Sequence, residues 1–144
     1  INKPKFVYTH FTRPHHPYFV DRNGLPPVVA DSLKGFARIQ KEYTEHLLYT
    51  NNRLLQLIDH ILTNSAIPPV ILLAGDHGFR QFSKETDQKY YFMNLCAVYL
   101  PGGNYSGFYD GLSPVNTFRV ILNSQFGQQF SLLKDSSIFL YEKP

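Results

Sequence analysis

A four-residue turn near the middle of the chain carries residue types that could bind a metal ion. It reads Gly75-Asp76-His77-Gly78 and directly follows the apolar residues 70–74. Carboxylate oxygens and imidazole nitrogens are both ligands of divalent metals in proteins, so Asp76 and His77 are candidate metal ligands. The alternative is a turn whose side chains hydrogen-bond only to their own backbone.

Three further histidines gather near the beginning of the chain. His10 lies within residues 5–11, and His15 and His16 follow between two prolines. Because proline fixes the backbone, we expect this loop to be held in shape. Held in this way, the histidines could contribute to a functional site. The alternative is that these histidines only decorate an irregular surface loop.

The segments around these residues predict an α/β fold. Residues 5–11 are rich in β-branched and aromatic side chains and predict a strand. The apolar residues 70–74, bounded by proline and glycine, predict a strand buried on both faces of a parallel sheet. Between them, Asp31 or Ser32 could cap a long helix that runs to about Leu62. Its apolar positions recur at intervals of three, four or seven and form one stripe: Phe36, Tyr43, Leu47, Leu54, Ile58 and Ile61. His46 and His60 lie in the same helix, and we expect them to be surface or boundary residues. Strand, helix and strand in this order are typical of a crossover between parallel strands.

The second half of the chain continues the alternation of strand and helix. Residues 93–100 predict a third strand, and residues 137–141 a short final one. Ser113 can cap a helix that has Pro114 at its first position. We therefore expect a single domain over residues 1–144, with a layered, mixed but mainly parallel sheet and flanking helices.

This arrangement predicts where the candidate residues meet. In open parallel sheets, ligands bind in the crevice outside the carboxyl ends of the strands. The first strand ends near His10, His15 and His16, and the second ends at Asp76 and His77. We therefore expect these residues to converge at one edge of the sheet.

Composition excludes some functions. Among 144 residues, 14 are basic and 11 acidic, for a net charge of +3. The basic residues are scattered, without a Lys/Arg cluster or an RNP-like aromatic motif, which argues against nucleic-acid binding. No apolar run is long enough to span a membrane. The chain begins at Ile1 and its only methionine is Met93, so we expect it to be a piece of a longer protein.

The motifs resemble those of the alkaline phosphatase superfamily, in particular its sulfatase-like branch, which includes lipoteichoic acid synthases and phosphoethanolamine transferases. Gly75-Asp76-His77-Gly78 after a buried strand resembles the second metal-binding motif of that superfamily. Pro14-His15-His16-Pro17-Tyr18 is similar to the Pro-His-x-Pro segment of sulfatases, whose histidine contacts the transferred sulfate or phosphate. The long helix, Pro101-Gly102-Gly103 and the helix start at Ser113-Pro114 also match. The resemblance implies a partial alkaline-phosphatase-like domain, the C-terminal part of a sulfatase-like catalytic domain.

The resemblance also implies roles for individual residues. Asp76 and His77 would be metal ligands, and His15, or in its place His16 or His10, would bind the oxyanion of the ester. No segment of this chain matches the nucleophile of the family or its first acidic ligands, so no catalytic residue is assigned and the chain alone is expected to be inactive. Its single cysteine cannot form an internal disulfide and, inside an apolar strand, is expected to be a buried small hydrophobic residue.

The resemblance narrows the metal and the reaction. Two-zinc members of the superfamily need a further histidine downstream, and none follows His77, so one divalent metal is expected in the full-length protein. An imidazole ligand favours manganese or zinc over calcium or magnesium. This preference in turn favours phosphoester chemistry over sulfoester chemistry. We expect this chain by itself to be metal-free or to bind metal weakly.

The implied function is that of a metal-dependent phosphoester or sulfoester hydrolase or transferase. Its partners would be the ester substrate, the rest of the catalytic domain and a second copy of this chain, through apolar surface left uncovered. Relatives of this type are often anchored in a membrane with the catalytic domain outside the cytoplasm, in the periplasm or at the cell surface. Two alternatives are a non-catalytic interaction module with the same fold and a phosphomonoesterase- or mutase-like enzyme, which the missing late histidine disfavours.

Overall fold

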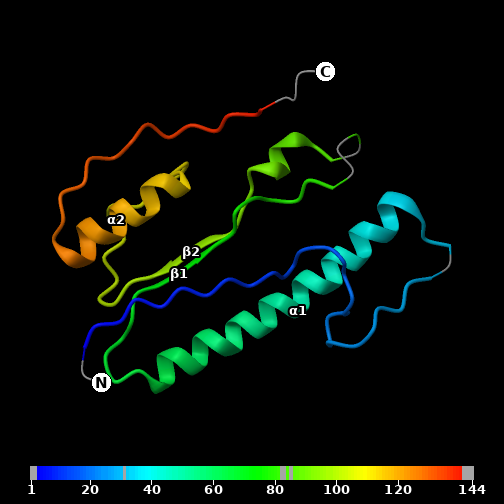
Figure 1. The fold of residues 1–144 in the computed structure, drawn as a ribbon, viewed down its shortest axis with the longest axis horizontal. Helices are drawn as coiled ribbons and strands as arrows, with labels where there is room; N and C mark the ends of the chain where they lie inside the picture. Colours follow the sequence, from blue (N-terminus) through cyan, green and yellow to red (C-terminus); the bar gives the residue numbers. More distant parts are fainter. Residues whose placement is uncertain (1–2, 31, 82–83, 85, 141–144) are drawn as a thin grey trace. The chain divides into compact units, whose positions relative to one another are not determined.

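The computed structural model describes residues 3–30, 32–81, 84 and 86–140. It contains helix α1 (Gly35–Asn64), strand β1 (Ile71–Ala74), the 3-10 helix η1 (Gln88–Tyr91), strand β2 (Cys96–Tyr99) and helix α2 (Pro114–Phe126) (Figure 1). Helices and strands both occur, as predicted. The chain divides into two compact units, Ile1–Asn64 and Ser65–Pro144, which are described separately below. The prediction of a single domain over residues 1–144 stays a prediction.

The sheet of the second unit has two strands among the described residues. β1 and β2 pair antiparallel, with Ile71 opposite Tyr99 and Ala74 opposite Cys96. Both strands were predicted in place. The predicted parallel pairing, of residues 5–11 with residues 70–74, does not occur among the described residues, whose sheet contains only β1 and β2. A parallel pair needs a long crossover, usually a helix, and the connection from β1 to β2 contains only the four-residue η1.

Two predicted strands are missing from the described residues. Residues 5–11 form no strand, and Phe6, Val7 and Tyr8 are 81%, 78% and 76% exposed. Residues 137–140 form no strand either, and Tyr141 lies outside the described residues. A strand is defined by hydrogen bonds to a neighbouring strand, and no strand of the described chain pairs with either segment. Of the predicted strand–helix–strand crossover, the described residues therefore contain the helix, α1, and the second strand, β1, but not the first strand.

Helix α1 follows the predicted apolar stripe. It begins at Gly35, three residues after the candidate cap Ser32, and ends at Asn64 rather than near Leu62; Asp31 lies outside the described residues. Shifts of this size are usual, because helix ends are poorly marked in sequence. The residues predicted to form the stripe are all at least partly buried: Phe36, Tyr43, Leu47, Leu54, Ile58 and Ile61.

Helix α2 begins and ends as its sequence predicts. Ser113 is the N-cap, Pro114 is the first helical residue, and Gly127 ends the helix in the left-handed conformation with φ of 63°. That conformation costs glycine little because glycine has no Cβ. Val120 and Ile121, on α2, are buried and together with Leu100 supply the apolar core of this unit.

Two asparagines of α2 hold the chain that follows the helix. Asn116 donates from Nδ2 to the Leu133 carbonyl at 2.8 Å and accepts the Leu133 N–H at 2.9 Å. Asn123 makes the same pair with Phe130, at 2.9 and 2.8 Å. We call these two pairs the asparagine clamps. They explain why residues 130–133 run alongside α2 without being a strand (Figure 1).

A carboxylate secures the same segment at the start of α2. Asp135 accepts hydrogen bonds from the Ser113 backbone N–H at 2.8 Å, from Asn116 Nδ2 at 2.9 Å and from the Ser113 and Tyr109 hydroxyls, both at 2.5 Å. These hydrogen bonds, the Ser113 hydroxyl first, hold the pKa of Asp135 far below its usual value. The segment after α2 is thus fixed at several points along the helix.

Candidate functional site

The Asp76-His77 turn follows β1 and is held by the chain that leads into β2. The Gly75 N–H donates to the Leu95 carbonyl at 2.8 Å, and Asn94 Nδ2 donates to the Gly75 carbonyl at 2.7 Å. These bonds extend the β1–β2 pairing by one step beyond Ala74. The turn therefore has a fixed base.

The other end of the turn packs closely on η1. The Gly78 N–H donates to the Tyr91 carbonyl at 2.9 Å. A Cβ atom on Gly78 would lie 1.8 Å from the Tyr90 carbonyl oxygen and 2.9 Å from that of Met93. Only glycine fits such an approach, because both neighbouring atoms belong to the backbone.

The two candidate metal ligands lie next to each other. His77 Nε2 is 3.6 Å from Asp76 Oδ2, and the Asp76 side chain is 90% exposed. His77 Nδ1 lies 2.7 Å from the Gly78 carbonyl oxygen. Since a carbonyl only accepts, Nδ1 carries the proton, which leaves the lone pair on Nε2.

This geometry fits two ligands of one metal ion. Two donors about 2.1 Å from a zinc ion at the tetrahedral angle are about 3.4 Å apart, close to the observed separation of 3.6 Å. A histidine that donates its other N–H to a carbonyl is the usual arrangement of a metal ligand. However, no group of three or more His, Cys, Asp or Glu side chains that could hold a metal occurs within the described residues. Asp76 and His77 are therefore two adjacent donor groups, without a third such group beside them in the described chain.

A pocket of about 460 Å³ opens beside these two residues. Arg80 shares its lining with them, is exposed, and forms no ion pair within the described ranges. The remaining lining residues are mostly aromatic or apolar: Tyr91, Phe92, Asn94, Pro114, Ser137, Ile138, Phe139 and Leu140. The pocket thus combines a polar rim near the turn with an apolar wall.

The three N-terminal histidines belong to the other unit. His10, His15 and His16 are all exposed. His15 Nδ1 lies 2.5 Å from the His16 carbonyl oxygen, so Nδ1 donates and Nε2 is left to accept, as in His77. The peptide bonds before Pro14 and Pro17 are cis. The convergence of these histidines with Asp76 and His77 stays a prediction.

His46, which we expected to be a surface or boundary residue, is buried in the first unit. His46 is 0% exposed, and neither ring nitrogen has a hydrogen-bond partner in the part of the chain that the structure describes. Its ring packs on Tyr18 and Phe19, at centroid distances of 5.9 and 5.3 Å. Burial lowers the pKa of His46. Its spacing of three residues from Tyr43, on the apolar stripe, was the available signal.

The partner of His46 in this cluster is a buried tyrosine. Tyr18 is 8% exposed and its ring contacts Tyr43 at a centroid distance of 5.6 Å. Burial, together with the nearby Tyr43 and Glu42, raises the pKa of Tyr18 to about 12. The residue that ends the Pro-His-His-Pro-Tyr run is therefore an anchor that packs the histidine loop onto α1.

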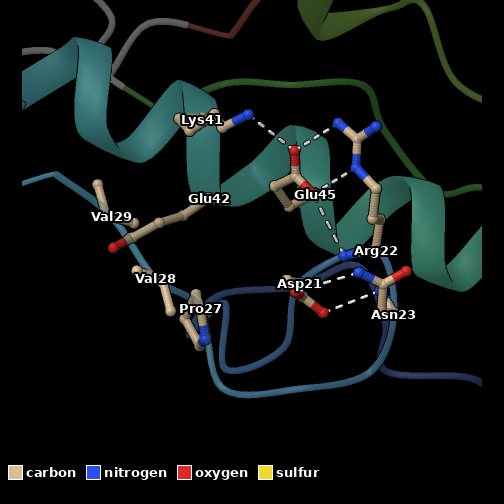
Figure 2. Close-up of a pocket in the computed structure, with 9 residues that line it drawn as sticks. All are labelled: Asp21, Arg22, Asn23, Pro27, Val28, Val29, Lys41, Glu42 and Glu45. Atoms are coloured by element: carbon tan, nitrogen blue, oxygen red, sulfur yellow. Dashed lines mark hydrogen bonds and ion pairs between the residues drawn. The ribbon is translucent and has the colours of Figure 1, made fainter.

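A second pocket, of about 270 Å³, lies between residues 21–29 and α1 (Figure 2). Three of its charged residues, Arg22, Lys41 and Glu45, pair with one another. Arg22 donates to both carboxylate oxygens of Glu45, at 2.6 and 2.7 Å, and Lys41 Nζ donates at 2.9 Å. These contacts, the Arg22 hydrogen bond first, hold the pKa of Glu45 far below its usual value.

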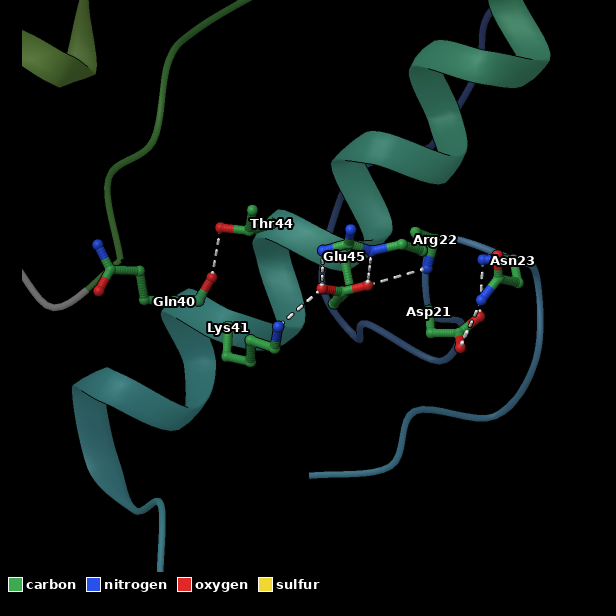
Figure 3. A network of polar contacts seen from close by, with 7 residues as sticks. All are labelled: Asp21, Arg22, Asn23, Gln40, Lys41, Thr44 and Glu45. Atoms are coloured by element: carbon green, nitrogen blue, oxygen red, sulfur yellow. Dashed lines mark hydrogen bonds and ion pairs between the residues drawn. The ribbon is translucent and has the colours of Figure 1, made fainter. Parts of the chain in front are cut away.

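The same network orders the loop next to this pocket. Asp21 accepts a hydrogen bond from the Asn23 backbone N–H at 2.8 Å (Figure 3). It also accepts one from the Leu25 backbone N–H at 3.0 Å. With its charges satisfied internally, the network fastens this loop to α1, and it offers a ligand little free charge.

Cys96 is exposed and unpaired by disulfide, so the prediction of a buried cysteine was wrong. Its Sγ lies 3.9 Å from the Thr117 hydroxyl of α2, but β2 is mostly exposed, with a single half-buried position at Val98. β1 is likewise only partly buried, rather than covered on both faces as predicted.

In the described part of the chain, no helix combines the length and apolar character that a membrane crossing requires. No family model, no curated protein and no solved structure matches this chain.

Proposed function

We propose that this chain is the C-terminal part of a sulfatase-like catalytic domain and contributes part of the metal site of a phosphoester or sulfoester hydrolase or transferase. The observation that carries the proposal is the Asp76–His77 pair. Its donor atoms are 3.6 Å apart, and the Gly78 carbonyl fixes the His77 tautomer that leaves Nε2 available.

Asp76 and His77 would hold one divalent metal ion, with manganese or zinc favoured by the imidazole ligand. Such an ion, when bound, polarises the ester and lowers the pKa of a hydroxyl nucleophile. The nucleophile and the remaining ligands would come from the rest of the parent domain. His15, or in its place His16 or His10, would contact the anionic oxygens of the ester.

The finer fold belongs to the same proposal. Within the whole catalytic domain, residues 5–11 would join a layered, mainly parallel sheet. The exposure of Phe6, Val7 and Tyr8, from 76% to 81%, supports this, because isolated apolar segments of strand-like composition need a partner. The parent would be membrane-anchored, with this domain on the extracytoplasmic side.

One observation favours the alternative, a non-catalytic interaction module. Large apolar side chains are exposed on both units, among them Val28 at 94%, Ile67 at 84% and Leu140 at 85%. Such surface suits contact with the rest of the parent domain, with a second copy or with another protein. The metal experiment below separates this module from part of an enzyme.

The proposal is tested by titrating Mn²⁺ into the ¹⁵N-labelled chain and following paramagnetic broadening of its amide signals. We expect weak binding, with broadening centred on Asp76 and His77, because two ligands hold a metal poorly. Asp76→Asn and His77→Gln should each remove it, whereas Asp110→Asn, an exposed aspartate outside the pocket, should not. Broadening that survives both ligand variants would refute the site, and tight stoichiometric binding would contradict its incompleteness.

A further inference from the structure

The pocket beside Asp76 is lined by two chemically different parts. Asp76, His77 and Arg80 form the polar part. Tyr91 and Phe92, at the end of η1, contribute to the apolar part together with residues of the segment that follows α2. A single pocket therefore offers both charge and apolar surface.

The apolar part is a cluster of aromatic rings. Phe139 lies 5.7 Å from the Tyr91 ring and 6.2 Å from the Phe92 ring, measured between centroids. These separations are typical of aromatic pairs in contact. Ile138 and Leu140, 73% and 85% exposed, flank Phe139 in sequence and also line the pocket. The exposed wall can thus bury an apolar group of a ligand.

The two parts of the pocket have a fixed spacing. Gly78, which directly follows His77, donates its N–H to the Tyr91 carbonyl at 2.9 Å. The turn approaches η1 so closely that there is no room for a side chain at position 78, where a Cβ would lie 1.8 Å from the Tyr90 carbonyl oxygen. A ligand that contacts the polar part therefore meets the aromatic wall at a set distance.

We infer that this pocket binds a phosphate monoester whose alcohol part is apolar. The inference rests on the proposed function, since it takes the bound anion to be the phosphate of the ester. The phosphate contacts Arg80, which carries no competing carboxylate partner in the described chain and can donate two parallel hydrogen bonds. The alcohol part lies on the wall of Tyr91, Phe92 and Phe139.

The size of the pocket agrees with this ligand. Its volume is about 460 Å³, within the range of about 300–1,000 Å³ that small-molecule sites occupy. A phosphate ion alone would leave the aromatic wall exposed to water. Burying that wall under an apolar group is favourable, and the gain is absent for inorganic phosphate.

The test compares three probes by NMR titration of the whole chain, with Mg²⁺ in excess to offset the charge of Asp76. The probes are inorganic phosphate, butyl phosphate and phenyl phosphate; the last two separate an alkyl from an aryl alcohol. Both esters are expected to bind about three- to tenfold more tightly than inorganic phosphate, as expected for one added aromatic or apolar contact. The amide shifts should centre on residues that line the pocket.

Variants test whether the ester preference depends on the aromatic wall and whether phosphate binding depends on Arg80. Phe139→Ala should lower the affinity for the two esters to about that for inorganic phosphate. The affinity for inorganic phosphate itself should not change. Arg80→Gln should weaken all three probes. Phe139→Leu, which keeps an apolar side chain, should retain the advantage of butyl phosphate. Phe126→Ala, at an exposed position of α2 outside the pocket, should change nothing.

Equal binding of the three probes, an ester preference that survives Phe139→Ala, or no binding of any probe would overturn the inference. Its failure is distinguishable from failure of the proposed function. Mn²⁺ broadening that depends on Asp76, without an ester preference, would leave the metal site standing. An ester preference that depends on Phe139, without Asp76-dependent Mn²⁺ broadening, would leave an anion pocket with no metal chemistry.

Discussion

Replacing Asn116 with alanine is expected to release residues 130–133 from α2. The Asn116 side chain is 0% exposed and exchanges two hydrogen bonds with Leu133, at 2.8 and 2.9 Å. It also donates to Asp135 at 2.9 Å. Asn123 is a matched control on the same helix, because it exchanges the same two bonds with Phe130 but is only half-buried, and Phe130 is exposed.

The expected magnitudes follow from the number of bonds and their burial. A neutral hydrogen bond contributes about 1 kcal/mol net, so losing the Leu133 pair should cost about 2 kcal/mol at Asn116. The lost contact with Asp135 acts in the same direction. At Asn123 water can replace both bonds, so the cost should be about 1 kcal/mol or less.

Amide hydrogen exchange measures these free-energy costs at individual residues. Asn116→Ala should accelerate exchange of the Leu133 N–H by about thirtyfold, the equivalent of about 2 kcal/mol. Asn123→Ala should accelerate exchange of the Phe130 N–H by about fivefold or less. Urea unfolding of both variants provides a global check. If the Leu133 amide exchanges at the wild-type rate in Asn116→Ala, the clamp does not hold this segment and the reasoning is refuted.

Other perturbations have equally defined outcomes. Gly78→Ala places a Cβ 1.8 Å from the Tyr90 carbonyl oxygen and should destabilise the fold by about 1–3 kcal/mol in urea unfolding; an unchanged midpoint would contradict that contact. Burial lowers the pKa of His46 below its ordinary 6.5, so the unfolded chain binds the proton more readily. Stability should then fall as pH drops from 7 through 6, by at most about 1.4 kcal/mol per pH unit, and His46→Leu should remove this slope; a slope that persists would locate the titration elsewhere. Glu45→Gln should raise amide exchange around Arg22 most strongly at low salt, and equal effects at low and high salt would argue against an ion pair.

Local signals predicted the helices well. The N-cap Ser113, the proline after it and the apolar stripe of α1 are read from neighbouring residues alone. The strand predicted at residues 5–11 failed because a strand needs a partner, which local sequence does not specify. The antiparallel pairing of β1 with β2 depends in the same way on long-range contacts.

The candidate site likewise has features that local sequence predicts and features that depend on long-range contacts. Asp76 and His77 are adjacent in sequence, so their pairing was predictable. The pocket wall could not be predicted, because Tyr91 and Phe139 are separated by nearly fifty positions and meet only through the fold. The buried state of His46 was missed since a helical histidine beside an apolar stripe is more often exposed.

The asparagine clamps set the register of residues 130–133 along α2. Seven residues of helix, from Asn116 to Asn123, advance about 10.5 Å, and three residues of extended chain, from Phe130 to Leu133, advance about 10 Å. The two lengths match, so both clamps close together in one register only. Inserting one residue between Phe130 and Leu133 would break that match, and removing one would do the same. Phe139 follows a few residues later. The register that α2 sets for residues 130–133 therefore also determines the position of the aromatic pocket wall.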